Sequence, residues 1–321
     1  MRVLVVGGAG YIGSHMVKSL LQRDCQVTVL DNLSAGYRDA VKGGRFVLGD
    51  LGELDVLEEV FRAGQFDGVM HFASHIQVGE SVREPARYYR NNVFKTQHLL
   101  DVMVAHRVRC FIFSSTAAIF GEPARIPIDE DHPRNPINPY GRGKWMVEQM
   151  LADYDVAYGL KSVSLRYFNA AGADPQGELG ERHEPETHLI PLVLRAAAGR
   201  LPQVTVFGTD YATPDGTCIR DYVHVTDLCE AHWLALRRLQ EGGDSVAYNL
   251  GNGNGFSVRE VIETARTVTG RDIPVVYGER RPGDPARLVA DARRARAELG
   301  WEPRYADLAT IIAHAWRWEA R

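Results

Sequence analysis

The sequence has few cysteines, no long apolar run and no excess of positive charge. Its four cysteines, Cys25, Cys110, Cys218 and Cys229, stand far apart without CxxC spacing. We therefore expect reduced thiols, and neither a disulfide framework nor a metal site. No apolar stretch reaches the roughly 20 residues that a membrane-spanning helix needs, and Met1 is followed by no leader-like segment. We expect a cytoplasmic protein with no membrane partner.

The charge balance argues against another class of partner. The 321 residues include 37 lysines and arginines against 41 aspartates and glutamates, which gives a formal net charge of -4. A protein that neutralises a nucleic-acid backbone needs a cationic surplus. We therefore expect no nucleic-acid partner, and an anionic small molecule would need a local basic pocket.

Strand-like and helix-like segments alternate through the first half of the chain. The expected strands are residues 3–6, 27–30, 45–48, 68–72, 110–114 and 162–166, and the expected helices are residues 13–22, 55–63, 88–105 and 144–158. Alternation of this kind predicts a doubly wound parallel sheet. After about residue 170 the pattern is irregular, with expected helices at residues 190–198, 226–238, 258–269 and 293–298.

These patterns predict an α/β fold. We expect a doubly wound parallel sheet of the Rossmann type in residues 1–170 and a smaller mixed α/β lobe in residues 171–321. The first would bind a dinucleotide, and the second would bind the substrate.

A glycine-rich turn follows the first expected strand. The run VLVVGGAGYIGSH places Gly7, Gly10 and Gly13 between a strand and a helix. Glycines there let the turn tighten and let backbone N–H groups approach a pyrophosphate at the positive end of the helix. Asp31 ends the second expected strand, 18 residues after Gly13, where a carboxylate can accept ribose hydroxyls and repel a 2′-phosphate. This pattern favours NAD over NADP, although an aspartate at a strand end can also simply cap a turn.

Tyr140 and Lys144 stand four residues apart in the run YGRGK, so both project from one face of a helix. Lowering a tyrosine pKa by three units would need roughly 4 kcal/mol of preferential stabilisation of the phenolate. The same spacing also occurs on ordinary helix surfaces. Upstream, however, FIFSSTAAIFG ends an expected strand with Thr116, and this combination resembles the active site of short-chain dehydrogenase/reductases.

A longer series of motifs recurs in order from residue 5 to about residue 284: GGAGYIGSH, LDNLS, HFAS with VGESV, NNV, FIFSST, NPYGRGK, LRYFNAAGA, FGTDY, DGTCIRDYVHV, YNLG and RRPGD. The series resembles the UDP-galactose 4-epimerases of the extended group of that superfamily. The resemblance implies interconversion of UDP-galactose and UDP-glucose by NAD-dependent oxidation to a 4-keto sugar, rotation and re-reduction at carbon 4. It implies that Tyr140 removes the proton of the 4-hydroxyl, that Thr116 holds that oxygen, and that Lys144 binds the nicotinamide ribose and lowers the Tyr140 pKa.

The resemblance also implies the remaining site residues, a UDP-sugar partner and a homodimer formed through the helices at 88–105 and 144–158. The implied NAD contacts are Gly7, Gly10, Tyr11, Ile12, Gly13, Asp31, Asn32, Asp50, Leu51, Phe72, Ala73, Asn92, Ser114, Tyr140, Lys144 and Tyr167. The implied UDP-sugar contacts are Thr116, Asn169, His188, Leu189, Phe207, Arg220, Arg281, Asp284 and Leu288.

Three positions depart from the family pattern. Thr187 and His188 replace a pair of asparagines, so affinity for UDP would depend on pH if the imidazole titrates near neutral pH. Ile76 replaces a lysine that contacts the cofactor in many relatives. Leu288 stands where some relatives have a tyrosine, which suggests room for an N-acetyl group and UDP-N-acetylglucosamine as a second substrate.

Other activities fit the sequence less well. A nucleotide-sugar 4,6-dehydratase needs an acid and a base directly after Thr116, whereas this chain has Ala117 and Ala118. A UDP-uronate decarboxylase is disfavoured for a similar reason, because no glutamate follows Thr116 directly. Epimerisation of a UDP-pentose or UDP-uronate stays open. A non-catalytic NAD-binding sensor is disfavoured because Thr116, Tyr140 and Lys144 are all present.

Overall fold

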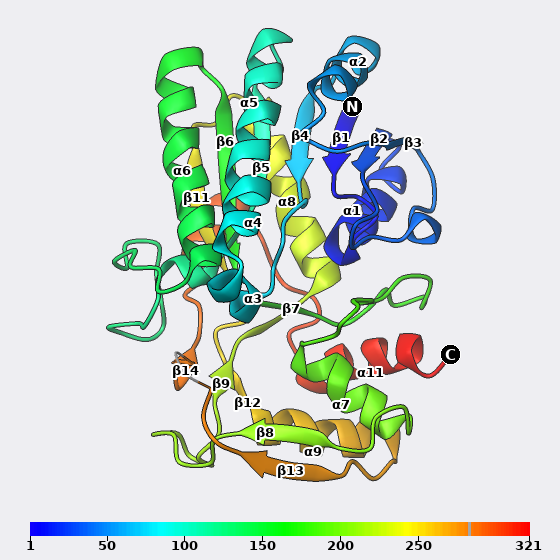
Figure 1. Cartoon of the computed structure of the whole chain (residues 1–321), viewed down its shortest axis with the longest axis vertical. Coiled ribbons are helices and arrows are strands. Elements are labelled where there is room, and N and C mark those ends of the chain that lie inside the picture. Colours follow the sequence, from blue (N-terminus) through cyan, green and yellow to red (C-terminus); the bar gives the residue numbers. More distant parts are fainter. Residues whose placement is uncertain (282–283) are drawn as a thin grey trace.

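The computed structural model describes residues 1–281 and 284–321, and its largest feature is a seven-stranded parallel sheet (Figure 1). The strand order is β11-β6-β5-β4-β1-β2-β3. The strands are β1 (Arg2–Val6), β2 (Gln26–Asp31), β3 (Arg45–Leu48), β4 (Gly68–His71), β5 (Cys110–Thr116), β6 (Lys161–Tyr167) and β11 (Val246–Leu250). Because every neighbouring pair is parallel, the carboxyl ends of all the strands meet at one edge of the sheet.

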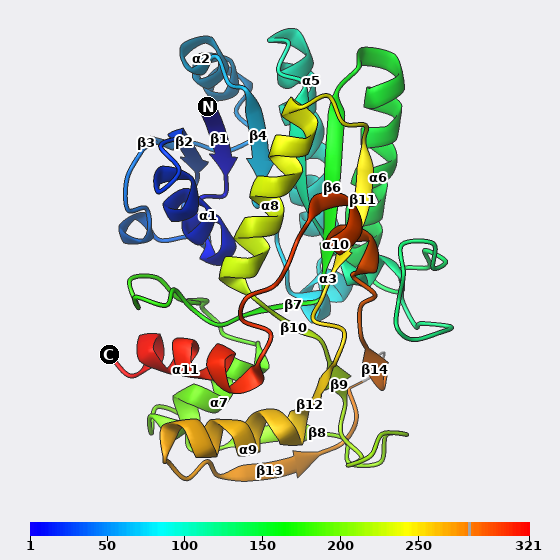
Figure 2. The ribbon, with the colours of Figure 1, turned by 180° about the vertical axis from the view of Figure 1, so that it is seen from behind.

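Helices cover both faces of this sheet. One face carries α2 (Leu54–Gly64), α5 (Lys95–Ala105) and α6 (Pro139–Tyr158) (Figure 1). The opposite face carries α1 (Tyr11–Leu21), α8 (Val225–Gln240) and α10 (Arg293–Leu299). These helices face the viewer in Figure 2, which shows the molecule from behind. The sheet is therefore buried on both sides, as its nearly continuous apolar strands require.

Alternation along the strands divides the core into two layers. In β5, Ile112 points into the layer under α1 and α8, whereas Phe111 and Phe113 point into the layer under α5 and α6. All three side chains are fully buried. At roughly 25 cal/mol per Å² of apolar area, this double burial is the main source of stability for the sheet.

The second lobe has its own core. It contains α7 (Leu189–Ala197), α9 (Val258–Thr269), α11 (Leu308–Glu319) and the parallel pair β8 (Val204–Phe207) and β13 (Val275–Gly278). These elements share one apolar cluster. Two small sheets join the lobes: β7 (Asn169–Ala171) with β10 (Tyr222–His224), and β9 (Ile219–Arg220) with β12 (Phe256–Ser257) and β14 (Arg287–Leu288).

The predicted fold class is confirmed, with local differences. The pattern after residue 170 suggested only the smaller lobe, but β11 pairs with β6 in the large sheet and α8 packs on its face. The helix expected at residues 88–105 is α4 (Pro85–Tyr89), a π-helical turn (Arg90–Phe94) and α5. Two further helices, α3 (Val78–Arg83) and α11, were not expected. No helix in the described part of the chain is long and apolar enough to cross a membrane.

Candidate active site

The glycine turn after β1 is closely packed. Gly7 has a φ of 79°, and a Cβ there would lie 2.5 Å from the backbone nitrogen of Ala73. A Cβ on Gly13 would lie 2.1 Å from the carbonyl oxygen of Gly7. Neither position accepts a side chain. A Cβ on Gly10 would make only an ordinary contact, at 3.4 Å, so a ligand that lies against the start of α1 is the better reason for a glycine there.

Asp31 ends β2 beside this turn. Its carboxylate accepts the N–H groups of Ala9 and Leu33, each at 2.8 Å. Burial raises the pKa of Asp31, and these two backbone hydrogen bonds act in the opposite direction. The contacts fix the carboxylate at the edge of the sheet, where a ribose can reach it.

Asp50 forms a second acidic position on this edge. It accepts from Asn32 at 2.6 Å and pairs with Lys95 at 2.7 Å. Burial alone would raise the pKa of Asp50, but the hydrogen bonds from Lys95, Gly52 and Asn32 hold it below its usual value. Sequence reasoning missed Lys95 because it lies 45 residues away, in α5.

The loop after β4 completes the cofactor side. Asn92 lies in the π-helical turn, where it accepts the His75 N–H and donates to the His75 carbonyl, both at 2.9 Å. Asn92 is predicted to contact NAD, and these two hydrogen bonds give it a structural role as well. They hold the loop that carries Phe72 and Ala73. Irregular helical turns of this kind often mark functional sites.

Lys144 is buried and has no direct anionic partner among residues 1–281 and 284–321. It lies in α6, which Pro139 and the cap residue Asn138 start five residues earlier than the sequence pattern suggested. Its Nζ donates to Ser74 Oγ and to the Ser114 carbonyl, both at 2.7 Å. Burial lowers the pKa of Lys144 to about 7, with Glu148 acting weakly in the opposite direction. Sequence reasoning missed Ser74, 70 residues upstream.

Tyr140 lies one helical turn before Lys144, with the lysine Nζ 6.0 Å from its ring centroid. Burial raises the pKa of Tyr140, and a hydrogen bond with Thr116 offsets only part of that rise. The lowered pKa that the resemblance implies is therefore not a property of the polypeptide alone. A lowered pKa would need positive charge added beside the phenol, as an oxidised nicotinamide would supply.

A buried ion pair supports these residues from beneath. Glu148 follows Lys144 by one turn of α6 and accepts from Arg166 Nη2 at 2.5 Å and from Ser115 Oγ at 2.5 Å. Only 5% of the Glu148 side chain and 3% of the Arg166 side chain are exposed. The pair ties α6 to the ends of β5 and β6. It carried no motif in the sequence and was not predicted.

Basic and aromatic residues converge in the second lobe. Arg220 donates to Asp284 and to the Pro285 carbonyl, each at 2.8 Å. The Arg281 guanidinium carbon lies 4.0 Å from the ring centroid of Phe207. Leu288 pairs with Arg220 in strand register and packs against the apolar cluster that begins at Ala117. The structure thus links the predicted UDP residues to the strand that carries Thr116.

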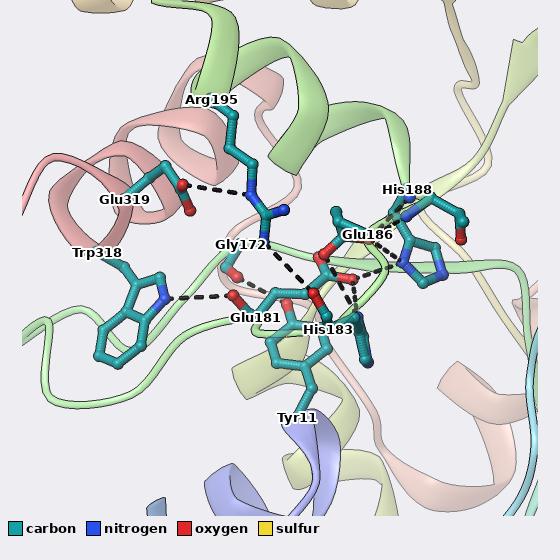
Figure 3. A network of polar contacts seen from close by, with 10 residues as sticks. Tyr11, Gly172, Glu181, His183, Glu186, His188, Arg195, Trp318 and Glu319 are labelled. Carbon is teal, nitrogen blue, oxygen red and sulfur yellow. Dashed lines mark hydrogen bonds and ion pairs between the residues drawn. The ribbon is translucent and has the colours of Figure 1, made fainter. Parts of the chain in front are cut away.

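His188 has different surroundings from those expected. Its Nδ1 lies 2.9 Å from carboxylate oxygens of Glu181 and Glu186 (Figure 3). Burial would lower the pKa of His188, but the two carboxylates raise it to about 10. The imidazole of the chain itself therefore stays charged at neutral pH, and the expected pH dependence of UDP affinity does not follow from it.

Two other predicted substrate residues lie close to the junction of the lobes. Asn169 opens β7 and donates through Nδ2 to the Asp221 carbonyl at 3.1 Å. Leu189 opens α7, immediately after His188. On the cofactor side, Tyr167 shares a hydrogen bond with Ser114, while Leu51 and Ile12 pack into the two core layers. Contacts of these residues with a ligand stay predictions.

The glycine turn, Asp31 and buried Lys144 together fit a dinucleotide lying along the carboxyl edge of a parallel sheet. The chain belongs to the NAD dependent epimerase/dehydratase family, whose model matches residues 3–251. The predicted class of enzyme and its dependence on NAD are thereby confirmed.

Particular relatives cover nearly the whole chain. It is 52% identical to the UDP-glucose 4-epimerase of Halalkalibacterium halodurans, over 99% of this chain and 95% of that protein. A crystal structure of UDP-glucose 4-epimerase from Brucella ovis in complex with NAD has a TM-score of 0.97 and 53% identity, covering 99% of this chain and 98% of that one. The corresponding enzyme from Bifidobacterium longum, in complex with NAD+ and UDP, has a TM-score of 0.94 and 40% identity, with 99% and 98% covered.

Proposed function

We propose that this chain is a UDP-glucose 4-epimerase that interconverts UDP-galactose and UDP-glucose at carbon 4. The observation that carries the proposal is the arrangement of Tyr140, Thr116 and Lys144 at the carboxyl edge of a dinucleotide-binding sheet. Thr116 hydrogen-bonds Tyr140, and Lys144 is buried among uncharged groups one turn away. The similar proteins named UDP-glucose 4-epimerase, at about half identity over the full chain, support this reaction.

The residues of the chain divide the work between proton transfer and positioning. When it is bound, NAD supplies a hydride acceptor and then a hydride donor for carbon 4 of the sugar. Tyr140 Oη takes the proton of the 4-hydroxyl and later returns it. Thr116 orients that oxygen, and the Lys144 ammonium favours the phenolate because the site is poorly solvated.

The residues after Thr116 restrict the reaction. Ala117 and Ala118 carry no group that can transfer a proton. Ala117 is buried in the cluster with Ile119 and Phe120. Elimination of the 6-hydroxyl, which needs a further acid and base, therefore lacks its catalysts at this position. This favours simple epimerisation over dehydration.

The UDP portion is assigned to the second lobe. Arg220 and Arg281 provide two guanidinium groups, which suit a pyrophosphate because each can form paired hydrogen bonds. Asp284 would accept ribose hydroxyls, Phe207 would contact the UDP portion, and Leu288 would line the sugar pocket. Leu288 in place of a tyrosine would leave volume for an N-acetyl group, so UDP-N-acetylglucosamine and its 4-epimer UDP-N-acetylgalactosamine are proposed as a second substrate pair.

We also propose a cytoplasmic homodimer. All four cysteines are free, as expected in a reducing compartment. Large apolar side chains are exposed along α6 and next to α5, with Phe94 59% and Val156 91% exposed. Sedimentation of the wild type and of Phe94→Glu tests the dimer: we expect a dimer that the charge dissociates, and a monomeric wild type would refute it.

A turnover experiment tests the reaction. The purified protein is incubated separately with UDP-galactose and UDP-N-acetylgalactosamine, with and without added NAD, and products are identified by NMR. We expect UDP-glucose from the first and UDP-N-acetylglucosamine from the second. If neither sugar reacts when NAD is supplied, the UDP-hexose assignment fails, and UDP-pentoses, UDP-uronates and a non-catalytic sensor become the alternatives.

A further inference from the structure

Four metal-ligating side chains converge in the loop that precedes α7. Glu181, His183, Glu186 and His188 each point one donor atom inward, and these atoms all lie within 4.8 Å of one another (Figure 3). The loop connects β7 to α7 and contains neither Tyr140 nor Lys144. The residues are spaced by two, three and two positions in the run ERHEPETH.

Three separations within the cluster, from His183 Nδ1 to both glutamates and from His188 Nδ1 to Glu181, are close to the edge of a small coordination tetrahedron. A zinc ion bound to nitrogen and oxygen at about 2.0 Å places neighbouring tetrahedral ligands about 3.3 Å apart. Here the Nδ1 atom of His188 lies 2.9 Å from Glu181 Oε1 and 2.9 Å from Glu186 Oε1. The Nδ1 atom of His183 lies 3.3 Å from Glu181 Oε1 and 3.5 Å from Glu186 Oε2.

Two of these atoms are buried without a hydrogen bond. Among residues 1–281 and 284–321, Glu186 Oε2 and His183 Nδ1 are buried and find no hydrogen-bond partner. The Glu186 side chain is 0% exposed and that of Glu181 is 7% exposed. A buried carboxylate oxygen without a partner is costly. A cation placed between the two atoms would remove that cost.

We propose that Glu181, His183, Glu186 and His188 bind one zinc ion through two carboxylate oxygens and two Nδ1 atoms. When zinc binds, the imidazolium groups of His183 and His188 each release one proton and become neutral ligands. The two positive charges of the ion then balance the two glutamate carboxylates in their place. Mixed nitrogen and oxygen donors in tetrahedral reach favour zinc over calcium or magnesium, which prefer oxygen and higher coordination. All four positions come from the protein, which is the pattern of a structural site.

The surrounding contacts hold the ligands in place. The backbone N–H groups of Thr187 and His188 donate to Glu186 Oε1 at 2.7 and 2.9 Å, which leaves Oε2 facing His183. Trp318 of α11 donates to the Glu181 carbonyl at 3.2 Å. Outer contacts of this kind usually set ligand orientation in metal sites.

The site would join the two lobes. Tyr11 opens α1 directly after the glycine turn, and its ring meets the edge of His183 at a centroid distance of 6.3 Å. Its hydroxyl donates to the Gly172 carbonyl at 2.7 Å. A metal on the loop at residues 181–188 therefore stiffens a contact with the start of the cofactor-binding helix, and this holds whichever sugar the enzyme uses.

Zinc binding by the wild type tests the proposal directly. Untagged protein is stripped with a chelator, given one equivalent of zinc, desalted and assayed by elemental analysis and by competition with a fluorescent chelator. We expect one zinc per chain, and at least tenfold weaker binding in both Glu186→Gln and His183→Asn. His106→Asn, which breaks a His–Glu pair outside the cluster, should bind zinc like the wild type.

Spectroscopy on the wild type keeps the test independent of variant folding. Cobalt added to the stripped protein should give the intense visible bands of a tetrahedral site, and X-ray absorption should show four nitrogen or oxygen ligands at about 2.0 Å from zinc. Six-coordinate metal, less than half an equivalent of zinc retained, or equal affinity in Glu186→Gln and the wild type would overturn the proposal. Activity of the enzyme is not part of this readout, so its failure and that of the epimerase proposal are separable.

Discussion

The sheet edge and the loop at residues 181–188 both bury ionisable groups, but they neutralise them differently. Lys144 faces a hydroxyl and a carbonyl, and burial lowers its pKa to about 7. Burial would also lower the pKa of His183, but Glu181 and Glu186 raise it to about 9. The uncompensated group is ready to change charge when a ligand arrives, whereas the compensated cluster holds its charge until a metal ion replaces the protons. Perturbed groups of the first kind mark sites of chemistry.

The largest expected effect is on activity and comes from the sheet-edge site, when the Tyr140 hydroxyl is removed. We expect Tyr140→Phe to lower kcat by roughly 10²- to 10⁴-fold, because proton transfer loses its positioned base. The measurement is the rate of UDP-galactose conversion by NMR. Tyr158→Phe removes a hydroxyl from the exposed end of the same helix and should keep wild-type activity. Equal rates in the two variants would remove Tyr140 from the mechanism.

Breaking the ion pair beneath the site should cost the next largest free energy. Glu148→Gln leaves Arg166 buried and uncompensated, so we expect the free energy of unfolding to fall by roughly 3–5 kcal/mol. Urea denaturation followed by circular dichroism measures it. As a control, Glu241→Gln breaks an ion pair at the surface, where the Arg237 side chain is 52% exposed and the Glu241 side chain is 63% exposed. This change should lower the free energy of unfolding by at most about 0.5 kcal/mol. A loss below 1 kcal/mol at Glu148 would show that the buried pair is not needed.

The lowered pKa of Lys144 predicts a pH dependence of stability in the cofactor-free protein. Its folded pKa is about 7 against 10.5 for the unfolded chain, so between these values the unfolded state holds more protons. The free energy of unfolding should therefore rise with pH in this window, by up to about 1.4 kcal/mol per pH unit from this group. Denaturation at several pH values should show this slope in the difference between the wild type and Lys144→Met. A flat difference from pH 7 to 10 would mean that Lys144 is charged when buried.

The smallest expected effect concerns the sugar. Leu288→Tyr fills space beside the cluster at Ala117, so kcat/KM for UDP-N-acetylgalactosamine should fall about tenfold, as for other steric changes in binding pockets. UDP-galactose serves as the control substrate, and its kcat/KM should stay unchanged. A parallel fall for both sugars would place Leu288 outside the N-acetyl space.

Local patterns predicted most of the strands and the shared helix face of Tyr140 and Lys144. Tyr140 and Lys144 could be found because residues four apart share a helix face, and Gly7 and Gly13 because a turn constrains them. Ser74, Lys95 and Arg166 could not be found this way, since tertiary packing alone brings them to the site.

Two other features were missed for different reasons. Strand β11 joins the large sheet although it follows the irregular part of the chain. It was missed because its pairing with β6 is visible only in the assembled sheet. The Glu181 to His188 cluster is local, so its spacing was visible in the sequence. His188 was predicted to contact UDP and His183 was given no role, and only the geometry shows four donors facing one point.

Retention of the hydrogen at carbon 4 tests the proposed reaction most directly. UDP-galactose carrying deuterium at carbon 4 would be converted in ordinary water and the UDP-glucose product examined by NMR and mass spectrometry. If the sugar is oxidised and re-reduced within one closed site, the deuterium stays at carbon 4 of the product. Loss of deuterium to water would instead show exchange with solvent protons at carbon 4, which would contradict the role assigned to Tyr140 and to the dinucleotide site.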